Sequence, residues 1–97
     1  MYKRQIPDDL IAREIAVLAD RTDVAEEVAR LRSHVIQWRE ALDQGGAVGR
    51  RLDFLTQELG REANTVGSKC QDAETTRIVV EMKVAVERLK EQAANLE

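Results

Sequence analysis

The sequence predicts an all-α fold, an antiparallel domain of about four helices in which the second and the fourth are long. Apolar residues recur at spacings of three and four in four separate segments, which is the pattern of amphipathic helices. No segment alternates between apolar and polar residues, as a half-buried strand would. The 97 residues are 43% hydrophobic but only 3% aromatic, so we expect one small domain with an aliphatic core.

The first expected helix covers residues 8–20 and follows Pro7, which is tolerated at a helix start. The second begins at Asp23, which forms a capping-box-like pair with Glu26, and ends at the glycine pair 45–46. The expected core positions of these two helices are Leu10 or Ile11, Ile15, Leu18, Val24, Val28, Leu31, Val35, Trp38 and Leu42. In the second helix they form a heptad-type stripe, which is typical of a helix that packs along its whole length.

The third expected helix starts near Gly49 and ends at about Gly67, and the fourth runs from about Asp72 towards Leu96. Both carry an apolar stripe at helical spacing. The stripe positions are Val48, Leu52, Leu55, Leu59, Ala63 and Val66 in the third helix, and Ile78, Met82, Ala85, Leu89, Ala93 and Leu96 in the fourth. Short connections between four such helices predict antiparallel neighbours.

Composition limits the classes of function. The chain has one histidine, His34, and one cysteine, Cys70, which excludes an ordinary structural zinc site and an internal disulfide. A single cysteine suits a reducing cytoplasm, and no apolar run approaches the roughly 20 residues of a membrane span. The net charge of −3 argues against a freestanding basic clamp on nucleic acid, and we expect no DNA partner.

The first five residues, MYKRQ, match what a common sequencing-library transposon end encodes when it is read from a GTG start. We therefore expect residues 1–5 to be an assembly scar and the natural sequence to begin near Ile6. Residues 6–97 would then form one helical domain. Any site that this domain shares with a preceding domain would be incomplete here.

The third helix has a polar face with unusually varied side chains. At 100° per residue, one arc contains Asp53, Gln57, Arg61 and Asn64, and the neighbouring arc contains Glu58, Glu62 and Thr65. Glu58 and Glu62 lie one turn apart, close enough to share a divalent ion such as Mg²⁺ or Mn²⁺. A metal there could activate water against a phosphodiester. From spacing alone, ordinary surface ion pairs are the favoured interpretation.

Two single residues need separate consideration. His34 follows Asp23, Glu27 and Arg30 along the second helix, and it is the only side chain able to supply imidazole acid–base chemistry. A contact with substrate or a packing role, held by Glu27 or Arg30, is favoured over catalysis. Phe54 projects from the polar side of the third helix; packing under a neighbouring helix is favoured over stacking on a base or entering another subunit.

The segment 49–74, GRRLDFLTQELGREANTVGSKCQDAE, closely resembles the carboxy-terminal domain of the YicC/YloC family of bacterial endoribonucleases. The resemblance continues through DVAEEVARLRSH (residues 23–34) and EQAANLE (residues 91–97), so it covers almost the whole chain. It implies a metal-dependent, protein-only endoribonuclease whose amino-terminal domain is missing here. It also implies RNA as substrate, Mn²⁺ or Mg²⁺ as cofactor, and assembly as a hexameric ring.

With the resemblance, the polar face of the third helix becomes a candidate site. The expected catalytic and metal residues are Glu58, Glu62 and Asp53, with Glu74 as a further metal ligand. The expected RNA contacts are Arg50, Arg51, Arg61, Asn64, Lys69 and His34. The expected subunit or domain interface consists of Val28, Leu31, Val35, Trp38 and Phe54. The alternative function is a non-catalytic helical module for oligomerisation, or an adaptor that steers RNA to another nuclease.

Overall fold

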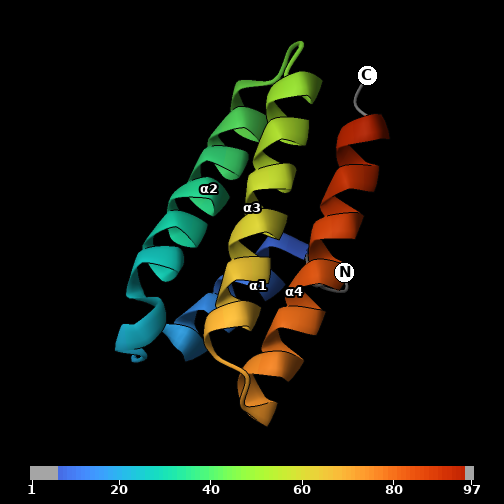
Figure 1. Ribbon diagram of the computed structural model, residues 1–97. Helices are drawn as coiled ribbons and strands as arrows, with labels where there is room; N and C mark the ends of the chain where they lie inside the picture. Colours follow the sequence, from blue (N-terminus) through green and yellow to red (C-terminus); the bar gives the residue numbers. More distant parts are fainter. Residues whose placement is uncertain (1–6, 96–97) are drawn as a thin grey trace, which may run out of the picture.

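The computed structural model describes residues 7–95, and these form four α-helices joined by short loops (Figure 1). The helices are α1 (Pro7–Leu18), α2 (Ala25–Gln44), α3 (Gly49–Lys69) and α4 (Ala73–Asn95), and a 3₁₀ turn, η1 (Thr22–Val24), precedes α2. Residues 7–95 contain no strand, so the predicted all-α class is confirmed. The expected scar at residues 1–5 and the expected core residue Leu96 lie outside the described residues.

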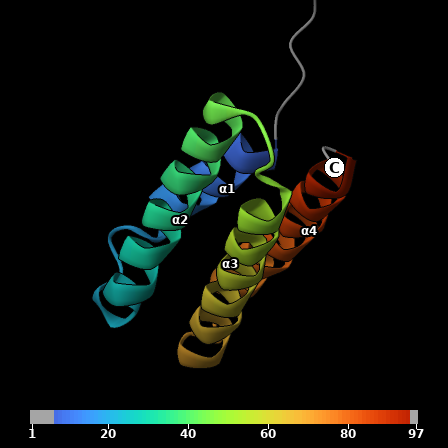
Figure 2. The same cartoon turned by 90° about the horizontal axis from the view of Figure 1, so that it is seen from above.

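The helices form a bundle in which α2 packs on α3, α3 on α4, and α1 on both α4 and α2 (Figures 1 and 2). The short helix α1 has 12 residues, against 20 to 23 in the other three. At 1.5 Å per residue, α1 is about 18 Å long and covers little more than half of the bundle. The long helices α2, α3 and α4 therefore determine the surfaces on which a site can be built.

The predicted stripes form one continuous core. Trp38 and Leu59 are fully buried within it, and of the two alternatives in α1 it is Ile11, and not Leu10, that is a core residue. Leu42 is the exception among the stripe residues, since it is 40% exposed. It lies in the last part of α2, where Ala41 takes the buried position instead.

Two expected helix ends are wrong. Asp23 does not cap α2: its carboxylate accepts a hydrogen bond from the Cys70 thiol at 3.1 Å, and α2 follows Val24 with no side-chain cap. That bond to Asp23 raises the pKa of the Cys70 thiol. Gly67 does not end α3, because the helix continues to Lys69. Its missing side chain instead faces Val79 of α4, which a Cβ atom would meet at an ordinary 3.5 Å.

The first helix ends at Leu18, two residues before its expected end, whereas the expected ends at the glycine pair 45–46 and at Asp72 are confirmed. Gly45 and Gly46 follow α2 with φ of 69° and 76°, in the left-handed region that favours glycine. Asp72 caps α4, because its carboxylate accepts hydrogen bonds from the Thr75 backbone nitrogen at 3.1 Å and the Thr75 hydroxyl at 2.9 Å. These bonds, led by the one from the backbone nitrogen, hold the pKa of Asp72 well below its usual range.

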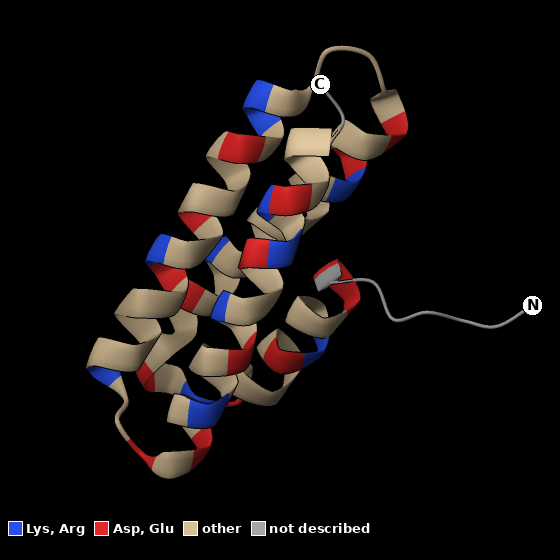
Figure 3. Ribbon diagram, turned by 90° about the vertical axis from the view of Figure 1, so that its right-hand side faces the viewer, with Lys and Arg blue, Asp and Glu red and all other residues tan. Residues whose placement is uncertain are grey.

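Charged residues of both signs are interleaved over the surface. In Figure 3, which shows the molecule from the α4 side, lysine and arginine lie next to aspartate and glutamate along the helices. Among residues 7–95, no helix has the length and apolarity needed to cross a bilayer. Specific sites have to be sought in local clusters of side chains.

Candidate metal centre between α2 and α3

One cluster of ligand-type side chains lies where α2 packs against α3. His34 comes from α2, and Glu58 and Glu62 come from successive turns of α3. One nitrogen of the imidazole and one oxygen of each carboxylate all lie within 4.8 Å of one another. Residues that are distant in the sequence are thus brought together by the packing of two helices, close to the size of a single ion's coordination sphere.

The members of the cluster differ in burial and in partners. Glu62 is buried, with 8% of its surface exposed, and its Oε2 accepts a hydrogen bond from Arg30 Nε at 3.0 Å. Glu58 is half-buried, and both its oxygens accept bonds from Arg61, at 3.1 and 3.3 Å. His34 Nδ1 is buried and has no hydrogen-bond partner among residues 7–95. The expectation that Glu27 or Arg30 would hold this imidazole is therefore not met at Nδ1.

Behind the cluster, Glu27 of α2 is 2% exposed and belongs to a chain of ion pairs. Its Oε2 accepts bonds from Lys69 Nζ at 2.9 Å and from Arg30 at 3.5 Å. The bond from Lys69 lowers the pKa of Glu27, and the same contact raises the pKa of Lys69. Arg30, whose pKa is raised by its bond to Glu62, joins Glu27 to Glu62. This chain fixes Glu62 from the α2 side.

The donor set fits a divalent cation. One imidazole nitrogen with two carboxylates suits Mn²⁺ better than Mg²⁺, which prefers an all-oxygen shell with several waters. The unpartnered His34 Nδ1 and the unpartnered, buried Oε1 of Glu27 show that polar atoms here lack protein partners. Buried polar atoms are nearly always satisfied, and a bound ion or an ordered water would supply the partners that these two atoms lack.

The structure brings together some of the predicted ligands and separates others. Among the described residues, the cluster comprises Glu58, Glu62 and His34 and does not include Asp53 or Glu74. Asp53 lines a hollow against α4, and its carboxylate accepts a bond from Gln57 at 3.0 Å. Glu74 is exposed in the first turn of α4. Neither of these two carboxylates contributes to the centre between α2 and α3.

The predicted RNA contacts also lie in different places, some near the cluster and others away from it. Arg61 pairs with Glu58 of the cluster, and Lys69 pairs with Glu27 behind it. Arg50 and Arg51 are exposed in the first turn of α3, at the end opposite Lys69. Asn64 lines a hollow between α3 and α4.

The predicted interface residues are mostly internal. Val28, Leu31, Val35 and Trp38 are buried in the core of the single chain, so in this fold they are not exposed to a second subunit. A heptad stripe indicates that a helix face is buried, but it does not indicate whether the partner helix belongs to the same chain. Phe54 is 57% exposed, so the favoured interpretation, packing under a neighbouring helix, is wrong.

Two residues that lie behind the cluster, Glu27 and Arg30, were not predicted as site residues. The sequence contained a signal for both: Glu27 directly precedes the core residue Val28, which places a carboxylate beside the apolar stripe. A charge in that position is rarely left buried without a partner. The partners, Lys69 and Glu62, lie 42 and 32 residues away in the sequence, which is why spacing could not identify them.

The comparisons with known proteins identify the family of the chain. The family model described as "Endoribonuclease YicC-like, C-terminal" matches residues 1–97. A "Probable endoribonuclease YicC" of Haemophilus influenzae is 51% identical over 87 residues, which cover 90% of this chain and 30% of the relative. A protein of the same description from Clostridioides difficile is 40% identical over 92 residues, 95% of this chain and 31% of the relative. The chain therefore belongs to the YicC-like endoribonuclease family, to which it corresponds through the family's carboxy-terminal domain.

Proposed function

We propose that this domain supplies a metal-dependent centre for the hydrolysis of RNA phosphodiester bonds. The observation that carries the proposal is the convergence of His34, Glu58 and Glu62 from two helices within 4.8 Å. Family membership supports an RNase, because the relatives are described as probable endoribonucleases. The chain spans about a third of the length of those relatives. That the domain is catalytically active by itself is therefore part of what we propose.

In this proposal the residues of the centre have distinct roles. His34 and Glu62 would hold the cation, and Arg30 keeps the Glu62 carboxylate in place from α2. When bound, a Mn²⁺ or Mg²⁺ ion would stabilise the negative charge that develops on the phosphate and lower the pKa of a bound water. Residues outside the coordination sphere then have to position the substrate and move protons.

Glu58 and Arg61 are placed for those tasks. The Glu58 side chain is 20% exposed, against 10% for Glu62, so it is the carboxylate more open to substrate. It would accept the proton of the attacking water, while the leaving oxygen would take a proton from solvent. Arg61 is 72% exposed at its side chain and would hold a neighbouring phosphate. Asp53 and Glu74 have no role in this arrangement.

We further propose RNA as the partner and a homo-oligomer as the working form, a hexamer as the family resemblance implies. Phe54 is the predicted interface residue that this fold leaves open to a partner, since it is 57% exposed while the other four are buried. It could stack on an RNA base or enter a neighbouring subunit.

One observation favours the second candidate function, a non-catalytic adaptor or assembly module. Val80 and Val84, one turn apart on α4, are 56% and 51% exposed, and they line a hollow with Leu10 of α1. Exposed apolar surface of this kind is typical of a docking site. An adaptor would depend on these residues and would have no metal-dependent turnover.

The test is cleavage of an end-labelled RNA by this chain with Mn²⁺, with and without EDTA. We expect cleavage that requires the metal and falls at least a hundredfold in Glu62→Gln, since a lost ligand removes the cation. The matched control is Glu40→Gln, an exposed glutamate of α2 that is not a member of the centre, which should cut like the unmodified chain. Folded chains that bind RNA but never cut it would favour the adaptor function.

A further inference from the structure

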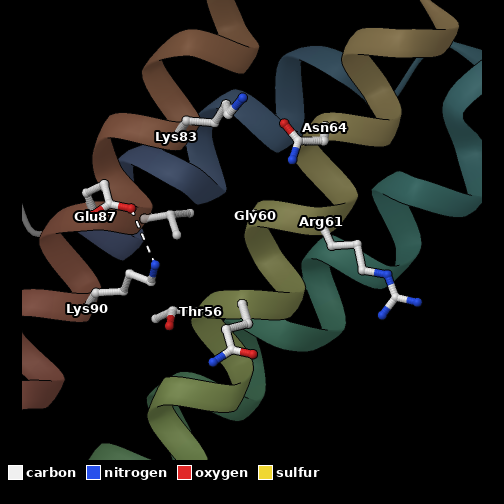
Figure 4. Close-up of a pocket in the computed structure, with 9 residues that line it drawn as sticks. Thr56, Gly60, Arg61, Asn64, Lys83, Glu87 and Lys90 are labelled. Carbon is white, nitrogen blue, oxygen red and sulfur yellow. Dashed lines mark hydrogen bonds and ion pairs between the residues drawn. The ribbon is translucent and has the colours of Figure 1, made fainter.

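A second feature of α3 lies on its other flank, a groove against α4. Its larger hollow, about 400 Å³, lies between residues of α3 and α4 that include Gly60, Asn64, Lys83 and Lys90 (Figure 4). A second hollow of about 300 Å³ shares Lys90 and extends towards the first turn of α3 at Arg50. The metal centre, by contrast, lies between α3 and α2.

Gly60 is not required by the fold. It lies in the middle of α3, where a glycine costs about 1 kcal/mol relative to alanine. A Cβ atom at this position would meet no atom within 4 Å, so neither close packing nor a positive φ explains the glycine. Because glycine has no side chain, the groove stays open at this position, and a ligand could approach the helix backbone there.

The groove is locally basic in a chain with a net charge of −3. Lys83, Lys90 and Arg50 line the two hollows, and Glu87 and Asp53 are the carboxylates there. Lys90 forms an ion pair with Glu87 at 3.5 Å, while Lys83 takes part in no ion pair among residues 7–95. Lys83 is therefore free to contact an anionic ligand, and Lys90 would do so by exchanging Glu87 for a phosphate.

The groove has polar groups on both walls. Figure 4 shows Lys83 on α4 and Asn64 on α3 facing each other across the hollow, while Arg61 points away from it, to the side where it pairs with Glu58. The arginine thus lies on the ridge of α3 between the groove and the metal centre. A strand held in the groove would have to cross only this ridge to reach Glu58.

From these observations we propose that the groove between α3 and α4 binds single-stranded RNA, with phosphates against Lys83 and Lys90 and the strand lying over Gly60. The proposal rests on the proposed function and deepens it. Residues 49–64 of α3, which border the groove, span roughly 22 Å at 1.5 Å per residue, enough for several nucleotides. No aromatic side chain lines either hollow. Recognition would therefore act mainly on the backbone, with little sequence preference and a strong dependence on salt.

The test measures the binding of a fluorescein-labelled single-stranded RNA by fluorescence anisotropy in EDTA, which leaves cleavage out of the experiment. We expect Lys83→Gln and Lys90→Gln each to weaken binding roughly fivefold and to lower the slope of log affinity against log salt by about 0.7. The matched control is Arg88→Gln, which removes one positive charge from α4 on the side facing the α1 hollow and should bind within twofold of the unmodified chain.

Gly60→Leu tests the groove without removing a charge. It fills the open floor and should weaken binding about tenfold, while the thermal midpoint should not fall, because leucine is a better helix former than glycine. Equal binding by Gly60→Leu and the unmodified chain, or losses in Arg88→Gln as large as in Lys83→Gln, would overturn the proposal. So would the absence of measurable binding by a chain that circular dichroism shows to be folded.

The two proposals fail in different ways. If the groove is right and the nuclease function wrong, the groove variants lose binding in EDTA although no condition yields cleavage. If the nuclease function is right and the groove wrong, Glu62→Gln abolishes cleavage while the lysine variants bind RNA as tightly as the unmodified chain.

Discussion

The substitution Glu27→Gln tests whether the chain of ion pairs behind the candidate metal centre stabilises the domain. Glu27 is 2% exposed, and its Oε2 accepts bonds from Lys69 at 2.9 Å and Arg30 at 3.5 Å. Glutamine keeps the shape and one acceptor oxygen but removes the charge. Lys69 and Arg30 would then each face a neutral amide in place of a carboxylate.

The expected cost follows from the exposure of the partners. Removing one member of a fully buried ion pair costs about 3–5 kcal/mol, because the remaining charge is stranded. Here the side chains of Lys69 and Arg30 are 47% and 49% exposed, so water can solvate them after the change. What is lost is mainly two charge-assisted hydrogen bonds in which the neutral oxygen is a weaker acceptor. We therefore expect Glu27→Gln to lower the free energy of unfolding by about 1–2 kcal/mol.

The assay is urea denaturation followed by circular dichroism, with Glu26→Gln, an exposed neighbour, as the matched control. The pKa of Glu27 is lowered in the fold, so its stabilisation is present above its unfolded pKa and is lost as the pH falls through the folded value. Glu27→Gln should therefore flatten the fall in stability below about pH 4.5. A change no larger than that of Glu26→Gln would refute the reasoning.

Three further predictions concern other parts of the molecule. Burial, and then the hydrogen bond to Glu81, raise the pKa of Glu14 to about 7, so the stabilisation by its protonated form is lost as the pH rises through that value. After allowance for solvent screening, we expect the free energy of unfolding to fall by about 1 kcal/mol between pH 6 and pH 8. Urea denaturation of Glu14→Gln at the same two pH values should show no such fall. Gly60→Ala should raise the free energy of unfolding by about 0.5–1 kcal/mol, because the new methyl group meets no atom; a lower thermal midpoint would contradict this. Phe54→Ala should leave the free energy of unfolding, measured by urea denaturation, within about 0.5 kcal/mol of that of the unmodified chain, because the ring is 57% exposed; a larger loss would indicate that the ring is buried.

The sequence predicted the fold well because helical periodicity is a local property. The stripes of α2, α3 and α4 follow directly from residue spacing, and Leu42 departs from its stripe only near the end of α2. The helix ends were less predictable. Aspartate is a common N-cap residue, yet the Asp23 carboxylate accepts a hydrogen bond from Cys70. Cys70 is 47 residues away in the sequence and lies near Asp23 only in the packed bundle.

The site was predictable only in part, for the same reason. Glu58 and Glu62 are one turn apart on a single helix, so their proximity follows from the sequence. Their association with His34 depends on the register between α2 and α3, which periodicity does not determine. Asp53 shows the converse: it lies on the same helix, but it lines a hollow against α4 and not the cluster between α2 and α3.

The central proposal is that His34 and Glu62, with Glu58 beside them, form a cation site, and Mn²⁺ binding tests it most directly. Titration with Mn²⁺ followed by electron paramagnetic resonance counts bound ions without requiring RNA or turnover. We predict one site per chain, weakened at least tenfold in Glu62→Gln and in His34→Ala, and unchanged in Asp53→Asn. A chain that binds no Mn²⁺ at millimolar concentration, or that binds it equally well in Glu62→Gln, would contradict the account.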